Sequence, residues 1–197
     1  MRVELKKLQA DVGTTFVYIT HDQGEAMIMS DFVAVMNSGR FEQIDTPKKL
    51  YSDPRSSFVA QFVGENNKFT GLAHKDENAR FYIHCGDNKR YLINGGKNFS
   101  EGGKIEMFVR PEDIVVNPKP GKENFNILTV TVKALLFDGS NNRLLVTAED
   151  SQNEMIVHPS TVKEFDYIKT GDTIKIGWNA GFSVCFEDSG VKVYGGA

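Results

Sequence analysis

One histidine stands where an α/β protein places groups that bind ligands. His21 directly follows the run 14–20, which is rich in β-branched and aromatic residues and is typical of a buried strand. Ligands of α/β proteins sit at the carboxyl ends of such strands. A neutral imidazole there can donate one N–H while the backbone holds its other nitrogen. His21 is therefore the one candidate for chemistry, and the alternative is a histidine that merely ends a strand.

The other charged or aromatic candidates favour structural roles. The motif Arg110-Pro111-Glu112-Asp113 could form an ion pair between domains or subunits, but a pair that fixes the turn after a strand is the simpler interpretation. Trp178 lies at a strand-alternating position, which favours core packing over a platform for a base or sugar. Lys48-Lys49 is most simply a solvated helix face. Three histidines follow no metal-ligand spacing, so we expect no metal among them: His74, His84 and His158.

Composition narrows the class of protein. The 197 residues carry 23 Lys+Arg against 26 Asp+Glu, a formal net charge of −3, which disfavours nucleic acid as a partner. No apolar run could span a bilayer, and the first seven residues are amphipathic rather than a signal peptide. Cys85 and Cys185 form no Cys-x-x-Cys motif, so we expect two buried free thiols in a reduced compartment. These features predict a cytosolic chain without direct membrane insertion.

Residues 1–65 alternate helix and strand signals. The patterns predict a helix over 1–12, the strand 14–20, and a second buried strand over 32–36 that is followed by a turn and a returning strand. Asp22 and Glu25 have capping-box spacing, which predicts a short helix. Thr46-Pro47 predicts another helix start, and a last short helix is expected over 58–63. Such buried strands with few helices to cover them are typical of the end of a larger α/β sheet domain.

Residues 66–197 predict a β-barrel or sandwich. Short strand candidates separated by Gly, Asn and Asp lie at 81–83, 91–93, 105–109, 127–132, 144–146, 155–157, 174–178 and 182–186. A faint repeat relates 103–109 to 171–178, with one extra residue in the second copy. Two small barrels, one barrel with a duplicated edge, or chance would each explain it. The fold class expected is mainly β, with a β-barrel region preceded by a partial α/β segment.

The segment from Tyr18 to Ala26, continued by Met29-Ser30-Asp31, resembles the switch region of ATP-binding cassette (ABC) ATPases. The resemblance continues through Thr46-Pro47 and Phe62-Val63-Gly64, and it is most similar to importer ATPases for polyamines, maltose and ferric iron. Arg110-Pro111-Glu112-Asp113 and the segment from Phe137 to Ser140 resemble the TOBE domain, an oligonucleotide-binding (OB)-type β fold that follows these ATPase domains. Gly24 departs from the family, which usually has an acidic residue there.

The resemblance implies the C-terminal region of an ABC importer ATPase, with the end of the nucleotide-binding domain at 1–65 and a TOBE/OB-like regulatory domain at 66–197. It implies that His21 contacts the γ-phosphate in the intact parent, which would bind ATP and Mg²⁺. The sequence contains no Gly-x-x-x-x-Gly-Lys-Ser/Thr loop, Leu-Ser-Gly-Gly-Gln signature or Walker B carboxylates. We therefore expect this chain alone to hold no nucleotide and to be inactive.

The resemblance also implies partners and a location. These are a second copy of the chain and, through the parent, transmembrane permease subunits, which would place the chain peripherally on the inner face of the cell membrane. A free-standing OB-like module that binds a small oxyanion or nucleic acid is the alternative. The switch-like segment 18–31 disfavours it, because such a module has no use for that segment.

Overall fold

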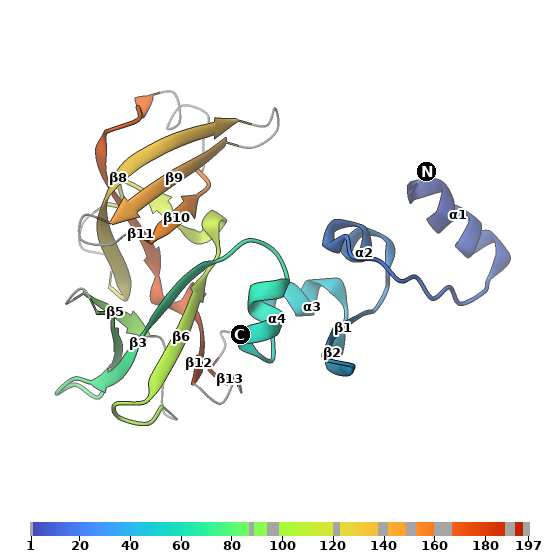
Figure 1. Cartoon of the computed structure of the whole chain (residues 1–197), viewed down its shortest axis with the longest axis horizontal. Helices are drawn as coiled ribbons and strands as arrows, with labels where there is room; N and C mark the ends of the chain where they lie inside the picture. Colours follow the sequence, from blue (N-terminus) through green and yellow to red (C-terminus); the bar gives the residue numbers. More distant parts are fainter. Residues whose placement is uncertain are drawn as a thin grey trace. The chain divides into compact units, whose positions relative to one another are not determined.

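The computed structural model describes residues 2–86, 89–93, 99–119, 123–137, 142–148, 153–159, 167–187 and 192–194. The chain forms two compact units, Met1–Gly64 and Glu65–Ala197. Strands predominate, which confirms the mainly β class expected (Figure 1). None of the helices in the described part of the chain has the length and hydropathy that a membrane crossing needs. The TOBE-like motif residues 138–140 lie outside the described residues.

The first unit contains four helices and one hairpin among its described residues. They are α1 (Arg2–Val12), α2 (Gln23–Met29), β1 (Val33–Asn37), β2 (Arg40–Asp45), α3 (Pro47–Ser52) and α4 (Ser57–Phe62). The turn between β1 and β2 has positive φ at both central residues, Ser38 (47°) and Gly39 (77°), which suits the twist of a two-residue hairpin. A small core unites the hairpin with the helices through Val35, Leu50, Val59 and Val63.

Two expectations for this unit were wrong. Residues 14–20 form no strand, and the side chains of Val17 and Ile19 are 89% and 93% exposed. The described residues of this unit offer that run no partner strand, and an unpaired strand leaves its backbone without a hydrogen-bonding neighbour. The expected buried strand at 32–36 forms as β1, but it pairs antiparallel with β2, and only Val35 in it is buried.

Strands and two short 3₁₀ helices make up most of the described part of the second unit. Its elements are β3 (Asn67–Lys75), β4 (Phe81–His84), β5 (Arg90–Ile93), β6 (Lys104–Val109), η1 (Pro111–Asp113), β7 (Val115–Val116), β8 (Phe125–Phe137), β9 (Asn142–Ala148), β10 (Glu154–Val157), β11 (Thr173–Asn179), η2 (Ala180–Phe182), β12 (Val184–Glu187) and β13 (Lys192–Tyr194). The sequence predicted neither β3 nor the short β7 and β13. It also wrongly placed Phe182 in a strand, since this residue lies in η2 and is exposed.

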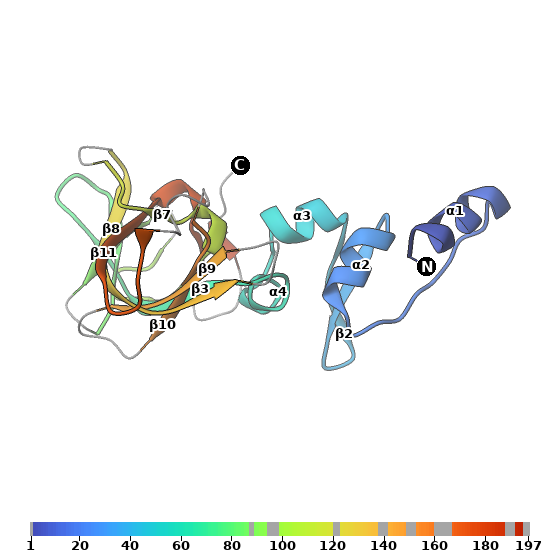
Figure 2. The ribbon, with the colours of Figure 1, turned by 90° about the horizontal axis from the view of Figure 1, so that it is seen from above.

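Two antiparallel sheets enclose one core in this unit. The strand orders are β10-β9-β8-β11-β7 and β13-β12-β6-β3-β4-β5, and Figure 2 shows the strands curving around a common interior. The aromatic rings of Phe69, Tyr91 and Trp178 meet at centroid distances of 5.0–5.4 Å. Because Phe69 and Tyr91 belong to one sheet and Trp178 to the other, these rings join both sheets in a single hydrophobic core.

The two sheets are duplicates that exchange a strand. The meander β3-β4-β5 followed by β6 has the same order as the meander β8-β9-β10 followed by β11. Strand β7 follows β6 and η1 in the chain, but it pairs with β11 of the other sheet. In the same way, β12 follows β11 and η2 but pairs with β6. Each half therefore completes the sheet of the other half.

The repeat expected from the sequence is real, but its alignment shifts by one residue. Gly102 has φ 73° and donates its N–H to the carbonyl of Ala73 at 2.8 Å, while Gly171 has φ 93° and donates to the carbonyl of Val132 at 2.8 Å. These glycines are equivalent, so 102–109 matches 171–178 with no extra residue. Positive φ is strained for residues other than glycine, which explains the glycine in both copies.

A buried asparagine begins the long strand of each half and binds the edge strand of the other sheet. Asn126 in β8 accepts the N–H of Leu92 at 2.7 Å and donates to the Leu92 carbonyl at 3.1 Å. Asn67 in β3 does the same with Ile156 of β10, at 2.8 Å and 2.7 Å. Both asparagines are at most 5% exposed. Each carboxamide thus replaces a missing strand partner and ties the sheets together.

We predict that Asn126→Leu lowers the free energy of unfolding of the chain by about 2–4 kcal/mol. The substitution removes two hydrogen bonds and leaves the N–H and C=O of Leu92 without their partner. Urea unfolding followed by fluorescence of Trp178 measures this change. Thr70→Ala, at an exposed position of β3, is the matched control and should change stability by less than about 0.5 kcal/mol. Equal effects of both substitutions would contradict this role of Asn126.

Candidate functional site

His21 lies in a turn that is held at both ends. Asp22 caps α2, with its carboxylate accepting the N–H of Glu25 at 3.0 Å, as the capping-box spacing predicted. The N–H of Asp22 donates to the hydroxyl of Thr20 at 2.9 Å. Helix α2 begins at Gln23 although Gly24 replaces the usual acidic residue. These bonds fix the backbone on each side of His21.

The carboxylate of Glu25 closes this turn from the helix side. It accepts the phenol of Tyr18 at 2.9 Å and the hydroxyl of Thr20 at 3.3 Å. The side chain of His21 stays exposed. Among the described residues, no three His, Cys, Asp or Glu side chains lie close enough to hold a metal ion. The arrangement presents one imidazole to solvent on a fixed turn, which suits contact with a ligand that another chain segment holds.

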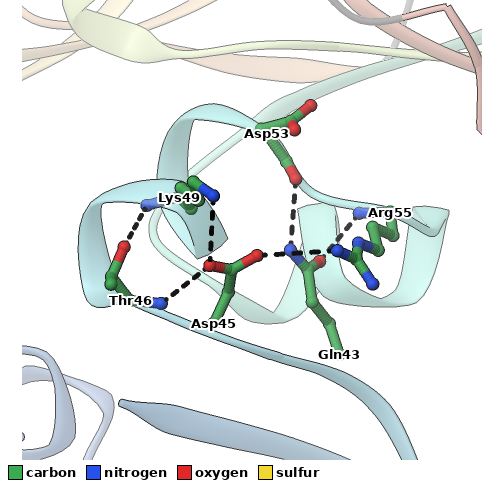
Figure 3. A network of polar contacts seen from close by, with 6 residues as sticks. All are labelled: Gln43, Asp45, Thr46, Lys49, Asp53 and Arg55. Atoms are coloured by element: carbon green, nitrogen blue, oxygen red, sulfur yellow. Dashed lines mark hydrogen bonds and ion pairs between the residues drawn. The ribbon is translucent and has the colours of Figure 1, made fainter. Parts of the chain in front are cut away.

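A buried glutamine organises the second half of this unit (Figure 3). Gln43 in β2 accepts the N–H of Arg55 at 2.8 Å and donates to the carbonyl of Asp53 at 3.2 Å. Beside it, the carboxylate of Asp45 accepts the N–H of Thr46 at 3.0 Å and lies 3.8 Å from Lys49 and Arg55. The network holds the connection between α3 and α4 against the hairpin.

One hydrogen bond connects the His21 turn with the end of the first unit. The side chain of Gln23 accepts the N–H of Gly64 at 3.2 Å across 41 residues. Gly64 has φ 73°, so the chain turns sharply there. Gln23, which directly follows His21 and Asp22, therefore positions Gly64, the last residue of the first unit.

The Arg110 motif anchors the start of the second unit. Arg110, 9% exposed, donates from Nη1 to the backbone carbonyl of Glu65 at 3.2 Å. The Glu65 carboxylate pairs with Arg143 at 2.9 Å and lies 3.4 Å from Nε2 of His158. Burial raises the pKa of Asp113, the charge of Glu112 adds to this, and Arg110 opposes it. Arg110 thus fixes the chain before β3, while the expected carboxylate pair at the turn after a strand stays a prediction.

Sequence reasoning missed this cluster because Arg110, Arg143 and His158 lie 45, 78 and 93 residues after Glu65, and no spacing rule joins them. It also missed that His74 and His84 meet, with ring centroids 4.6 Å apart across β3 and β4. His74 Nδ1 lies 2.9 Å from Glu101, so this histidine has a protein partner.

The remaining candidates have ordinary structural positions. Trp178 is fully buried and donates Nε1–H to the hydroxyl of Ser183 at 3.1 Å, which confirms core packing. Lys48 and Lys49 are exposed on α3, as a solvated helix face should be. Both cysteines are free, although only Cys185 is fully buried, and burial raises the pKa of its thiol.

Comparison with known proteins agrees with the resemblance of the sequence. Residues 107–186 match the TOBE domain family, and that match begins in β6 and ends in β12. The chain therefore contains a TOBE domain in its second unit.

Its relatives are ATP-binding proteins for spermidine/putrescine import, named PotA. The Thermobifida fusca protein is 35% identical over 178 residues, covering 90% of this chain and 46% of the relative. The Rubrobacter xylanophilus protein is 34% identical over 182 residues, covering 91% and 47%, and the Clostridioides difficile protein is 37% identical over 153 residues, covering 74% and 42%. The chain spans about half the length of these curated relatives.

A solved structure of a cytoplasmic molybdate-binding protein, ModG, is similar to 60% of this chain and 94% of its own length, with a TM-score of 0.49 and 17% identity.

We predict that Gln43→Leu speeds amide hydrogen exchange at Arg55 by roughly 10- to 100-fold, because its N–H loses the carboxamide acceptor. NMR-detected exchange on the full chain measures this. Gln61→Leu, at an exposed position of α4, is the control and should leave the Arg55 rate unchanged. An unchanged rate in Gln43→Leu would show that the network does not hold the connection between α3 and α4.

Proposed function

We propose that the chain is the C-terminal regulatory and dimerisation region of the ATP-binding subunit of an importer. The observation that carries this proposal is the combination of a switch-like His21 turn with a duplicated TOBE-type β module in one chain. The relatives support it over 74–91% of the chain. A free-standing binding module leaves the match of the first unit to importer proteins unexplained.

In the intact subunit, ATP hydrolysis would depend on a phosphate loop and Walker B carboxylates that this sequence lacks. His21 would supply an imidazole N–H to the γ-phosphate of ATP, held there with Mg²⁺ by the rest of the subunit. The fixed turn around His21 supports this role, because a hydrogen-bond donor that needs no reorganisation stabilises developing charge best.

The exposed apolar residues of the first unit support attachment to a larger sheet. Val17 and Ile19 in the run 14–20 are 89% and 93% exposed, and Ile28 and Phe32 are also more than half exposed. Apolar surface of this extent is typical of a face that another segment covers. In the importer subunit, the run 14–20 would form a strand beside strands of the ATPase domain.

The proposed partners are a second copy of the chain and, through the ATPase domain, the permease subunits, on the cytoplasmic face of the membrane. The second unit supplies the surface for the copy. Leu136 and Phe137 are 49% and 69% exposed at the end of β8, and Ile127 is also exposed. A dimer through such residues does not need nucleotide, and we expect it to bury roughly 1,200–2,000 Å².

We predict that the full chain is a dimer in light scattering across a concentration series, with or without Mg-ATP, because the proposed contact lies in the β module. A dimer that persists after deletion of residues 1–64 would assign the interface to the second unit. Phe137→Ser is expected to weaken the dimer, while Thr70→Ala, at an exposed position of β3, is the matched control. A constant monomer mass at high protein concentration would contradict dimerisation by this region.

A further inference from the structure

Strand pairing brings two histidines together on one face of a sheet in the second unit. His74 of β3 lies opposite Tyr82 of β4, and His84 follows two residues later on the same face of β4. The alternate residues Ala73 and Ile83 belong to the core, so the histidines are on the face turned away from it. The expectation of no metal at these histidines rested on spacing along the chain, which does not describe contacts between paired strands.

The separation of the two imidazole rings fits a shared metal ion. The ring centroids of His74 and His84 lie 4.6 Å apart, and the ring planes are inclined by 65°. Metal–imidazole bonds are about 2.0–2.1 Å long, so two imidazoles at about 90–110° around one ion have centroids roughly 4.5–5.2 Å apart. The observed separation lies within this range, so the backbone does not have to move for both rings to reach one ion.

Glu101 fixes the tautomer of His74. Its Oε1 lies 2.9 Å from Nδ1 of His74, and an ionised carboxylate only accepts hydrogen bonds, so Nδ1 carries the proton. Its Oε2 accepts the N–H of Lys75 at 2.9 Å, which holds the carboxylate in place. The neutral imidazole of His74 therefore keeps its lone pair on Nε2. Histidines that bind metals almost always donate their other N–H to a carboxylate, carbonyl or water in this way.

His84 is accessible, and the charges around the pair are mixed. The side chain of His84 is exposed, so its ring can turn to bring a nitrogen to an ion from solution. Arg90 of β5 lies directly opposite His84, and its guanidinium lies 5.2 Å from the ring centroid of Tyr82. This cation opposes a divalent ion, while the carboxylate of Glu101 attracts it. Two protein ligands and one repelling charge indicate a site of moderate affinity, with water at the remaining positions.

The duplicated fold provides an internal comparison for the pair. By the equivalent turn hydrogen bonds and strand registers, His74 corresponds to Lys133 and His84 corresponds to Thr147. Neither a protonated lysine nor a threonine replaces an imidazole as a metal ligand. The other half of the unit thus forms the same strand pairing without this pair, so the fold itself does not require two histidines here.

We propose that His74 and His84 bind one divalent transition-metal ion of the kind that prefers imidazole, such as Zn²⁺, and that Glu101 orients His74 through its Nδ1–H. The part of the chain that the structure describes contains no group of three such ligands, so this is a site with two protein ligands. The bound ion would join β3 to β4 on the face away from the core. The proposal is independent of the proposed importer role, because all of its residues lie in the second unit.

Calorimetric titration of the full chain, prepared without a histidine tag, with zinc chloride tests the proposal. We expect saturable binding of one ion per chain at micromolar concentration, with changes in the imidazole ¹⁵N signals of His74 and His84. Magnesium chloride should give neither effect, because Mg²⁺ prefers oxygen ligands. His74→Gln and His84→Gln should each weaken zinc binding by about tenfold or more, since a single imidazole remains.

Three further variants separate this site from general binding of metal to histidines. Glu101→Gln should weaken binding by roughly tenfold, because the charged acceptor that orients His74 is lost. Arg90→Gln should strengthen it by about two- to fivefold, because a repelling charge is removed. His158→Gln alters another histidine of the same unit and is the matched control, which should keep the affinity within about twofold.

Three outcomes would overturn the proposal. These are heats that never saturate, imidazole signals that change equally at all four histidines, and a loss of affinity in His158→Gln as large as in His84→Gln. The titration of the unaltered chain decides the first two outcomes even where a variant fails to fold. The dimer measurement is separate, so either result leaves the proposed function to its own test.

Discussion

The second unit depends on two asparagine carboxamides that take the place of missing strand partners. Asn126 binds both backbone groups of Leu92, and Asn67 binds both backbone groups of Ile156. Each bond pair ties the first residues of a long strand to the edge strand of the opposite sheet. The two sheets are thereby joined around the core that contains Trp178.

Duplication with strand exchange explains why this unit is a single body rather than two small barrels. Strands β7 and β12 each complete the sheet of the other half, so neither half buries its core alone. Gly102 and Gly171, which the turn before each equivalent strand needs, repeat in both halves.

Local patterns in the sequence predicted most of the individual helices and strands. They did not predict contacts between residues that lie far apart in the sequence. Strands with alternating or β-branched residues were found, and Asp22 and Glu25 predicted the start of α2 from their spacing alone. Strand β3 was missed because Gly71, Thr70 and Lys68 dilute its apolar pattern, and β7 is only two residues long. The Glu65 cluster joins residues that lie far apart in sequence. The run 14–20 has the composition of a buried strand, but a strand also needs a neighbour, and the first unit provides none among its described residues.

Native-state hydrogen exchange on the full chain tests the central claim most directly. The account predicts that the amides of Leu92 and Ile156 exchange as slowly as Val130 in the sheet centre, because the asparagine side chains protect them as strand partners would. It predicts fast exchange at Val17 and Ile19. Rapid exchange of Leu92 and Ile156, at the rates of exposed edge strands, would contradict the conclusion that the two carboxamides hold the sheets together.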